Sequence, residues 1–125
     1  MWASVRDFHD MSWATNVVTT CTAVGEKKGD QIGAKRVLND AFHETMIGLS
    51  EAERTVRYTI DDGPSPVSRD DVSNYVGVLR LHPITEGDAT FVEWSSSWEG
   101  RENGAGEFCH GIYVALLGDL RKAHA

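Results

Sequence analysis

Cysteine, which builds disulfide frameworks and many metal sites, is scarce in this chain. Cys21 and Cys109 are the two cysteines among 125 residues, and they form no CxxC pair. The five histidines fall in no HxH or HExxH motif. These patterns predict two reduced thiols and no metal site. Since GxGxxG and GxxxxGKS/T motifs are also missing, a nucleotide cradle has no support and we expect no cofactor.

Long apolar runs and an excess of positive charge are missing as well. The net charge is −7 and the sequence pI is about 5.1, whereas nucleic acids and anionic membranes attract clustered Lys and Arg. No stretch approaches the roughly 18–20 apolar residues that span a bilayer. The start, MWASVRDFHD, is charged by Arg6 and has no apolar core of a signal peptide. We therefore expect a cytoplasmic protein without nucleic-acid or membrane partners.

Residues 1–125 have the length and composition of one globular domain. Hydrophobic residues make up 41% of the chain and charged residues 25%, as in ordinary folded proteins. A chain of this length buries roughly two-thirds of the surface that it exposes when unfolded. The sequence therefore predicts one domain with a substantial core.

The residue pattern predicts a short helix, six strands and a long helix, in that order. The first helix is expected over residues 2–8. The strands are expected at 14–24, 32–39, 42–49, 54–60, 72–82 and 89–98. The last helix is expected from residue 108 onward, after a linker at 101–107. Its apolar residues recur at every fourth position, at Phe108, Ile112, Leu116 and Leu120.

The short connections predict an antiparallel sheet. One long helix can cover only one face of that sheet, so we expect the α+β class: a curved antiparallel sheet of about six strands that grips the C-terminal helix.

Several short motifs resemble the START-like or SRPBCC superfamily, the helix-grip proteins. This superfamily includes the birch-pollen allergen type, the polyketide cyclase/dehydrase-like group and the plant abscisic acid receptors. The resemblance extends over nearly the whole chain and rests on the order and spacing of its motifs. They are VRDF at 5–8, Trp13, IGAKR at 32–36, Glu44, RYTIDDGPSPVS at 57–68, NY at 74–75, VEW at 92–94 and the C-terminal helix. The resemblance implies a ligand cavity between the sheet and the helix.

The chain departs from the family pattern at two places. Bacterial members often have Trp-His where this chain has Trp13-Ala14. Relatives also begin with a full strand before the first helix, and this chain begins inside that helix. We therefore expect a truncated reading frame, and an open sheet edge along residues 90–98 that favours a homodimer.

The resemblance also implies which residues line the cavity. It places Glu44, Tyr75 and Glu93 at inward positions of three strands, where they would form one polar end. The cavity lysine of the abscisic acid receptors aligns with Thr15, so an anionic ligand would lack its counter-ion. The apolar stripe of the last helix would supply the floor through Phe108, Ile112 and Leu116. Two inward carboxylates would favour a neutral or cationic ligand with hydroxyl or amine donors.

The alternation of residues 90–98 conflicts with an inward Glu93. One face of this strand carries Phe91 and Glu93, and the other carries Trp94 and Trp98. Composition alone would bury the tryptophan face, whereas the resemblance buries the glutamate face. Both hold only if the tryptophans mark a covered outer surface, and we adopt that interpretation.

The sequence is compatible with three functions. The first is a carrier or ligand-binding protein for a small hydrophobic or amphipathic molecule. The second is an enzyme of the cyclase or dehydratase type that uses Glu44 or Glu93 as acid or base and Tyr75 as donor. The third is an accessory or structural protein with a filled pocket. The sequence alone does not say whether the protein catalyses a reaction.

Overall fold

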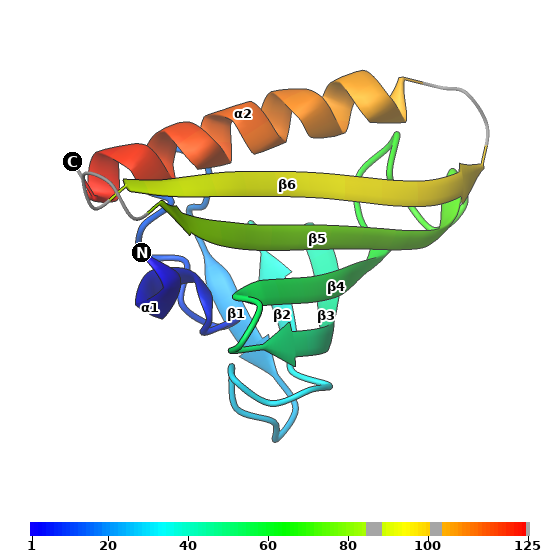
Figure 1. Cartoon of the computed structure of the whole chain (residues 1–125). Helices are drawn as coiled ribbons and strands as arrows, with labels where there is room; N and C mark the ends of the chain where they lie inside the picture. The colour runs from blue at the N-terminus through cyan, green and yellow to red at the C-terminus, as the bar shows by residue number, and fades with distance from the viewer. Residues whose placement is uncertain (85–88, 101–103, 125) are drawn as a thin grey trace.

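A computed structural model describes residues 1–84, 89–100 and 104–124 of the chain. The elements are α1 (Trp2–Val5), β1 (Cys21–Val24), β2 (Lys35–Leu38), β3 (Phe42–Ser50), β4 (Thr55–Asp62), β5 (Val72–Ile84), β6 (Ala89–Gly100) and α2 (Ala105–Ala123). Figure 1 shows α2 running along the long strands β5 and β6, with α1 at the opposite side of the fold from the α2 N-terminus.

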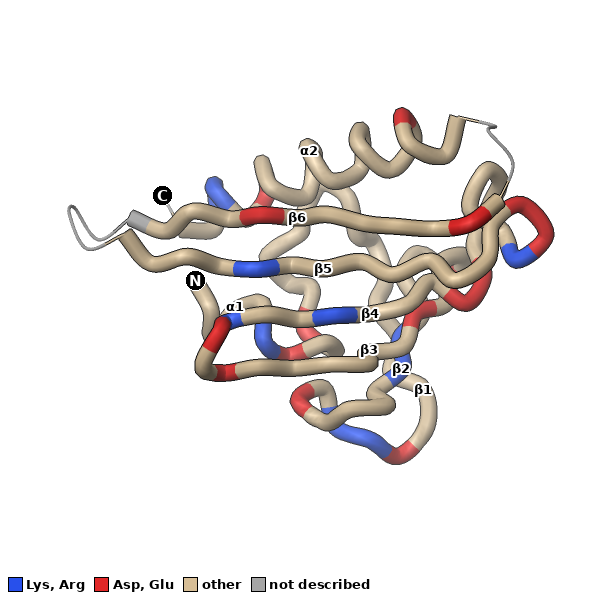
Figure 2. Tube along the Cα trace, turned by 45° about the vertical axis from the view of Figure 1, so that its right-hand side comes forward, with Lys and Arg blue, Asp and Glu red and all other residues tan. Residues whose placement is uncertain are grey.

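The six strands form one antiparallel sheet in chain order, from β1 at one edge to β6 at the other. Short connections between neighbouring strands produce this order, because antiparallel strands need only a hairpin between them. The sheet curls, so that β1 and β2 lie well away from β6 (Figure 2). The predicted α+β class, with a curved antiparallel sheet and a long C-terminal helix, is confirmed.

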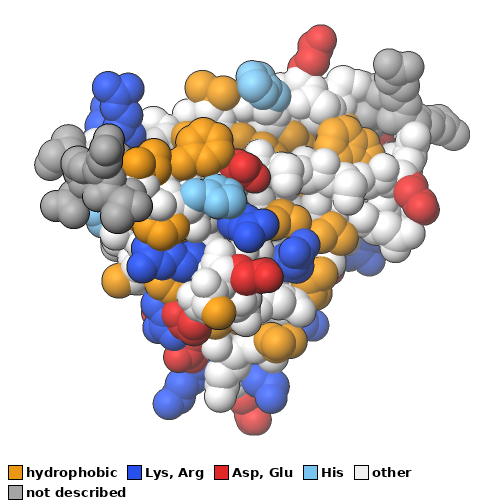
Figure 3. Space-filling view, viewed as in Figure 1, with side chains coloured by type: hydrophobic (Ala, Val, Ile, Leu, Met, Phe, Trp, Pro, Cys, Tyr) orange, Lys and Arg blue, Asp and Glu red, His pale blue; other side chains and the backbone are white. Residues whose placement is uncertain are grey.

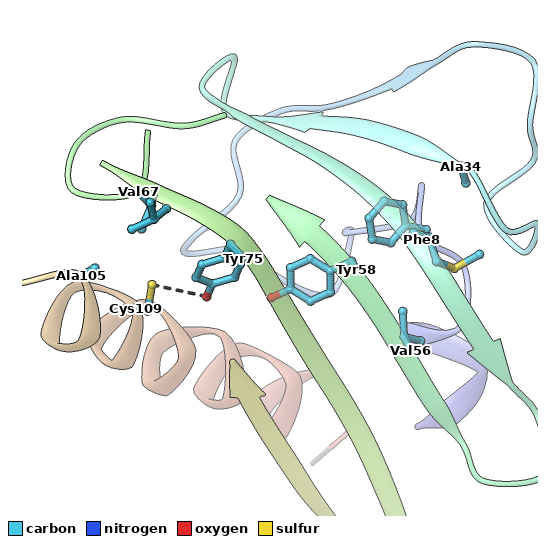
Figure 4. Packing of buried hydrophobic residues seen from close by; sticks show 10 residues of the cluster. Phe8, Ala34, Val56, Tyr58, Val67, Tyr75, Ala105 and Cys109 are labelled. Carbon is cyan, nitrogen blue, oxygen red and sulfur yellow. Dashed lines mark hydrogen bonds between the residues drawn. The ribbon is translucent and has the colours of Figure 1, made fainter. Parts of the chain in front are cut away.

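The helix α2 buries one stripe against the inner face of the sheet. Leu116 and Leu120 are buried with Leu79 and Leu81 of β5, and Cys109 is buried near Tyr75. Buried side chains near both ends of α2 therefore contact the sheet, as the apolar residues at every fourth position predict. Figure 4 shows Tyr58 and Tyr75 projecting from β4 and β5 on the side that faces α2.

Gly77 of β5 allows the close approach of an aromatic ring. It pairs with Tyr58 of β4, and a Cβ atom at this position would overlap the Tyr58 ring. The ring can lie across β5 only because glycine has no side chain. Gly77 thus fixes where the Tyr58 hydroxyl points.

The predicted strand at 14–24 is mostly wrong, because only Cys21–Val24 form β1 and residues 14–18 form turns. Val17 and Val18 bond back to the Ala14 carbonyl, and side chains from elsewhere take other amides of this segment, as described below. Thr- and Val-rich composition favours a strand, but these local and tertiary hydrogen bonds decide otherwise.

The prediction that Glu93 points inward is also wrong. Phe91, Glu93, Ser95 and Ser97 are exposed, whereas the alternate residues of β6 are half-buried. Trp94 and Trp98 pack against the core, so they do not mark an outer surface. Two indole rings remove far more apolar area from water than the opposite face of the strand would, and this difference sets the orientation of β6.

The outer face of the sheet carries Glu93 among mixed side chains. Glu93 is 56% exposed, and its Oε1 lies 3.3 Å from His82 Nε2, in a geometry that is not aligned as a hydrogen bond. The ring of Phe91 lies 5.7 Å from that of His82. Figure 3 shows acidic, basic, histidine and hydrophobic side chains side by side on the face viewed in Figure 1.

Several predicted boundaries shift when compared with the structure. The helix α1 ends at Val5, and β4 and β5 extend to Asp62 and Ile84. The helix α2 begins at Ala105, within the predicted linker, of which residues 101–103 lie outside the described part. Within the described residues, no helix is both long and apolar enough to cross a membrane.

Candidate functional site

A pocket of about 310 Å³ lies between α2 and the inner face of the sheet. Phe108, Ile112 and Leu116 of α2 form one wall. The sheet contributes mainly apolar and aromatic side chains, and Val17 and Val18 contribute from the segment before β1. The lining residues from the sheet and its turns include Leu38, Phe42, Ile60, Pro64, Tyr58, Tyr75 and Trp94.

A buried ion pair forms one polar part of the pocket wall. Arg36 of β2 and Glu44 of β3 are opposite each other in the sheet register, and their side chains are 7% and 6% exposed. Both Nε and Nη2 of Arg36 lie 2.7 Å from Glu44 Oε1. Burial raises the pKa of Glu44, and the Arg36 guanidinium acts against that shift.

The Arg36 guanidinium is held on its other side as well. Its Nη1 donates to the Phe8 carbonyl at 3.0 Å and to Met11 Sδ at 3.3 Å. Its carbon lies 3.8 Å from the centre of the Phe8 ring, close enough for a cation–π interaction. The guanidinium is therefore fixed in orientation rather than free to turn toward the pocket.

A chain of hydrogen bonds forms the second polar part of the wall. Trp94 Nε1 donates to the Tyr58 hydroxyl at 2.9 Å, and that hydroxyl lies 3.3 Å from the Tyr113 hydroxyl. The Tyr113 and Tyr75 hydroxyls are hydrogen-bonded to each other. The Tyr75 hydroxyl donates to Cys109 Sγ at 3.4 Å (Figure 4).

The three tyrosine hydroxyls that take part in these hydrogen bonds stay protonated at neutral pH. Burial is the largest cause of a raised pKa for Tyr58, Tyr75 and Tyr113. Burial also raises the pKa of the Cys109 thiol, which makes it a poor nucleophile. This row of hydrogen-bonded side chains therefore offers the pocket neutral groups and no anion at neutral pH.

The segment 14–20 closes one side of the pocket and is held at both ends. The buried Asp119 carboxylate of α2 accepts from the amides of Asn16 and Val17 at 3.0 and 3.2 Å. The Asn39 side chain accepts from the Thr19 amide at 2.7 Å and donates to the Val17 carbonyl at 2.9 Å. These bonds keep Val17 and Val18 against the pocket.

Five of the seven predicted pocket residues lie around this space, and two do not. Glu44, Tyr75, Phe108, Ile112 and Leu116 line it. Thr15 is exposed and is not among the lining residues, because the turn at 14–18 aims it outward. Glu93 lies on the other face of the sheet, so the predicted polar end of Glu44, Tyr75 and Glu93 does not form. Contact of the five lining residues with a ligand remains a prediction.

The sequence patterns do not predict several other lining residues, which include Arg36, Tyr58, Tyr113, Trp94 and Cys109. The signal for Trp94 was the alternation of its strand. Tyr113 lies one position after Ile112 of the apolar stripe. Arg36 lies in the short strand β2, opposite Glu44 of β3. No pattern in the sequence reveals that a buried arginine faces the glutamate.

Within the described residues, no group of three His, Cys, Asp or Glu side chains could hold a metal ion. Cys21 and Cys109 are both free thiols. The polar groups of the pocket lining include the Arg36–Glu44 pair, the tyrosine hydroxyls with Cys109, and Asn39.

Comparison with known families identifies the group of proteins to which these features correspond. The model of the polyketide cyclase / dehydrase and lipid transport family matches residues 1–125. The chain belongs to this family. No curated protein matches it. The family description covers cyclisation, dehydration and lipid transport, so it fits both a binding pocket and a catalytic pocket.

Solved structures of related proteins share the fold. One protein from Nitrosospira multiformis is 48% identical, with a TM-score of 0.93 over 95% of this chain and 82% of that chain. XoxI from Bacillus cereus is 23% identical, with a TM-score of 0.75 over 98% and 83%. A major latex-like protein from Panax ginseng is 14% identical, with a TM-score of 0.72 over 90% and 78%.

The last two likenesses show the fold alone, because their sequences are distant. The family match over residues 1–125, with the 48% identical structure and the shared fold, confirms the predicted membership of the START-like helix-grip superfamily.

Proposed function

We propose that this family member binds a small, largely apolar molecule in the pocket between α2 and the sheet, and that it acts as a carrier or ligand-binding protein. The observation that carries the proposal is the pocket itself, with about 310 Å³ of space lined mainly by apolar and aromatic side chains. A water molecule takes up about 30 Å³ in the liquid and covalently bonded atoms pack more closely, so this space fits a compact molecule of roughly ten to twenty non-hydrogen atoms.

The ionisable groups of the pocket favour binding over acid–base catalysis. A general acid or base must be able to exchange a proton with the substrate. Arg36 contacts Glu44 Oε1 at 2.7 Å and works against protonation of this carboxylate, and Tyr75 uses its hydrogen on Cys109. Glu93, the other candidate acid or base, lies outside the pocket. A cyclase or dehydratase therefore has less support than a carrier.

A neutral fluorescent probe tests the proposal. N-phenyl-1-naphthylamine should brighten when it binds the folded protein and should be displaced by uncharged hydrophobic competitors. Leu116→Trp should abolish the signal, because the larger ring fills the space beside α2. The matched control is Val114→Trp, since Val114 lies on the exposed face of the same helix and is 55% exposed. A folded wild-type protein that binds no probe would support the accessory function with a filled pocket.

Self-association and location belong to the same proposal. Among the described residues, β6 pairs with β5 alone, so its other edge is available to a second copy of the chain. We propose a homodimer through this edge. The two free thiols support a cytoplasmic location, and the net charge of −7 supports the lack of a nucleic-acid partner.

A further inference from the structure

The pocket presents hydrogen-bond acceptors, while most of its donors are already used. Arg36 illustrates the donor side. Its Nε and Nη2 contact Glu44, and its Nη1 contacts the Phe8 carbonyl and Met11 Sδ. One of the two hydrogens on Asn39 Nδ2 is used on the Val17 carbonyl. Among the described residues, the second Asn39 hydrogen and the hydrogens on Arg36 Nη2, which contacts Glu44 without an aligned hydrogen bond, are the donors left here, and the Arg36 side chain is 7% exposed.

The acceptor side begins with Glu44. Both contacts from Arg36 are made to Oε1, and Oε2 has no hydrogen-bond partner within the described part of the chain. The Glu44 side chain is 94% buried and lines the pocket. Oε2 is not among the fully enclosed polar atoms that lack a partner, so it keeps accessible surface, and a ligand that donates to it gains a charge-assisted hydrogen bond.

The direction of the tyrosine chain adds one more acceptor. The Trp94 indole can only donate, and Tyr75 donates to Cys109 Sγ. The hydrogens of Tyr58 and Tyr113 therefore lie in the bonds to the next hydroxyl along the chain. The Ser96 side chain also bonds to Tyr75 and Tyr113, so the Tyr58 oxygen is the phenol oxygen that keeps a lone pair for a ligand, and this wall has no unused phenol donor.

The net charge of the pocket wall also influences which ligands can bind. Arg36 and Glu44 compensate each other, and the phenols and the Cys109 thiol are neutral. A carboxylate ligand would have to lose its hydration without meeting a free cation, and it would approach Glu44 and the Tyr58 oxygen. An ammonium ligand would likewise have to lose its hydration in a pocket that is neutral overall.

We propose that the pocket selects uncharged molecules that carry a hydroxyl donor on an apolar, compact frame, and that Glu44 Oε2 accepts the hydrogen bond from that hydroxyl. This inference rests on the proposed ligand-binding function and adds the chemical class of the ligand. Glu44 is then a specificity-determining residue, oriented by Arg36.

A matched series of naphthalenes tests the selection by isothermal titration calorimetry at pH 7. The members are 2-naphthol, which is neutral and donates a hydrogen bond, 2-methoxynaphthalene and naphthalene, which do not donate, and 2-naphthoate, which is anionic. We expect 2-naphthol to bind at least about tenfold more tightly than each of the others, as one hydrogen bond to a charged acceptor allows.

Two variants assign the effect to Glu44. In Glu44→Gln the advantage of 2-naphthol over 2-methoxynaphthalene should shrink to less than about threefold, and 2-naphthoate should begin to bind because Arg36 is no longer compensated. If that variant does not fold, Arg36→Met/Glu44→Leu replaces the pair without leaving a buried charge. In the double variant the preference for 2-naphthol should be lost, and 2-naphthoate should still not bind.

The outcomes separate this inference from the proposed function. If wild-type protein binds the four compounds equally, or binds 2-naphthoate most tightly, the selection is wrong while ligand binding stands. If both variants keep the full preference for 2-naphthol, Glu44 is not its source and the inference is overturned. If wild-type protein binds none of the four compounds and no N-phenyl-1-naphthylamine, the proposed function fails with it.

Discussion

Arg36 and Glu44 carry much of the chemistry of the pocket in two residues. They face each other across β2 and β3, and both are nearly inaccessible to water. Taking two charges out of water costs several kcal/mol per ion, and close contact with further hydrogen bonds must offset that cost. The Phe8 carbonyl and the Phe8 ring supply such contacts to Arg36, so the pair is fixed in orientation.

Removal of the Arg36 guanidinium should reveal the free-energy cost of burying the Glu44 carboxylate. We expect Arg36→Met to lower the free energy of unfolding by about 3–5 kcal/mol at neutral pH. Arg36 opposes the burial that raises the pKa of Glu44 above its usual 4.5, so the variant raises that pKa further. A raised pKa in the folded state gives stability that is present at low pH and is lost as the pH rises. The decrease in the free energy of unfolding caused by Arg36→Met should therefore be smallest near pH 4 and grow toward pH 7.

Urea unfolding at several pH values measures this dependence. Arg57→Met is the matched control, because Arg57 lies on the exposed face of β4, and it should cost little at any pH. A loss of stability for Arg36→Met that does not change between pH 4 and pH 7 would contradict the assigned role of Glu44.

Individual residues were predictable from the sequence where one physical effect dominated. Leu116 and Ile112 were found from helical spacing, because burial of aliphatic side chains sets that pattern. Glu93 was misplaced, since the resemblance was preferred over the alternation that buries Trp94. Arg36 was missed because its pairing with Glu44 depends on the register of two strands, which local composition does not fix.

The segment 14–20 is an element held in place by side chains rather than by a ladder. Its amides at Asn16 and Val17 bond to Asp119, and those at Thr19 and Thr20 bond to Asn39. The sequence favours a strand here, because threonine and valine suit pleated structure. Polar partners more than a hundred residues away, at Asp119, cannot be recognised from a local window, and this explains why the prediction failed.

Asp119 should control how firmly this segment closes the pocket. We expect Asp119→Ala to speed amide hydrogen exchange at Asn16 by at least about tenfold, because its acceptor is removed, and at Val17 by less, because that amide keeps the Ala14 carbonyl. Exchange at Met46, whose amide bonds to the Ala34 carbonyl at 2.8 Å, should change much less. Glu107→Ala at the exposed start of α2 is the control variant. Unchanged exchange at Asn16 and Val17 would show that Asp119 does not hold the segment.

At the scale of the whole molecule, the order of elements was the most predictable feature. Six strands at hairpin spacing followed by one amphipathic helix allow few arrangements, and the structure has the antiparallel sheet and the long helix. The size and lining of the pocket were less predictable, since they depend on how far the sheet curls. Residues such as Gly77, which admits the Tyr58 ring, influence that packing without any signal in the pattern.

The edge of β6 predicts the behaviour of the protein in solution. Residues 90–98 contain no Pro and no Lys, the usual features that block pairing of edge strands. Because Trp94 and Trp98 face inward, pairing would rest on the strand edge and not on covering their rings. Sedimentation velocity at micromolar concentration should detect a dimer, and Ser95→Lys/Ser97→Lys should shift it toward monomer, whereas Ser73→Lys on β5 should not. A wild-type protein that sediments as a monomer at all concentrations would refute this association.

The central claim is that an apolar molecule occupies the space between α2 and the sheet. The most direct measurement is NMR of methyl-labelled protein with bound 2-naphthol, which records intermolecular NOEs from the ligand to individual methyl groups. A ligand in this pocket should give NOEs to Val18, Ile112 and Leu116, which line it, and none to Ile47 or Val114, which are exposed. NOEs to Ile47 or Val114 without any to Ile112 and Leu116 would place the ligand on the surface and contradict the account.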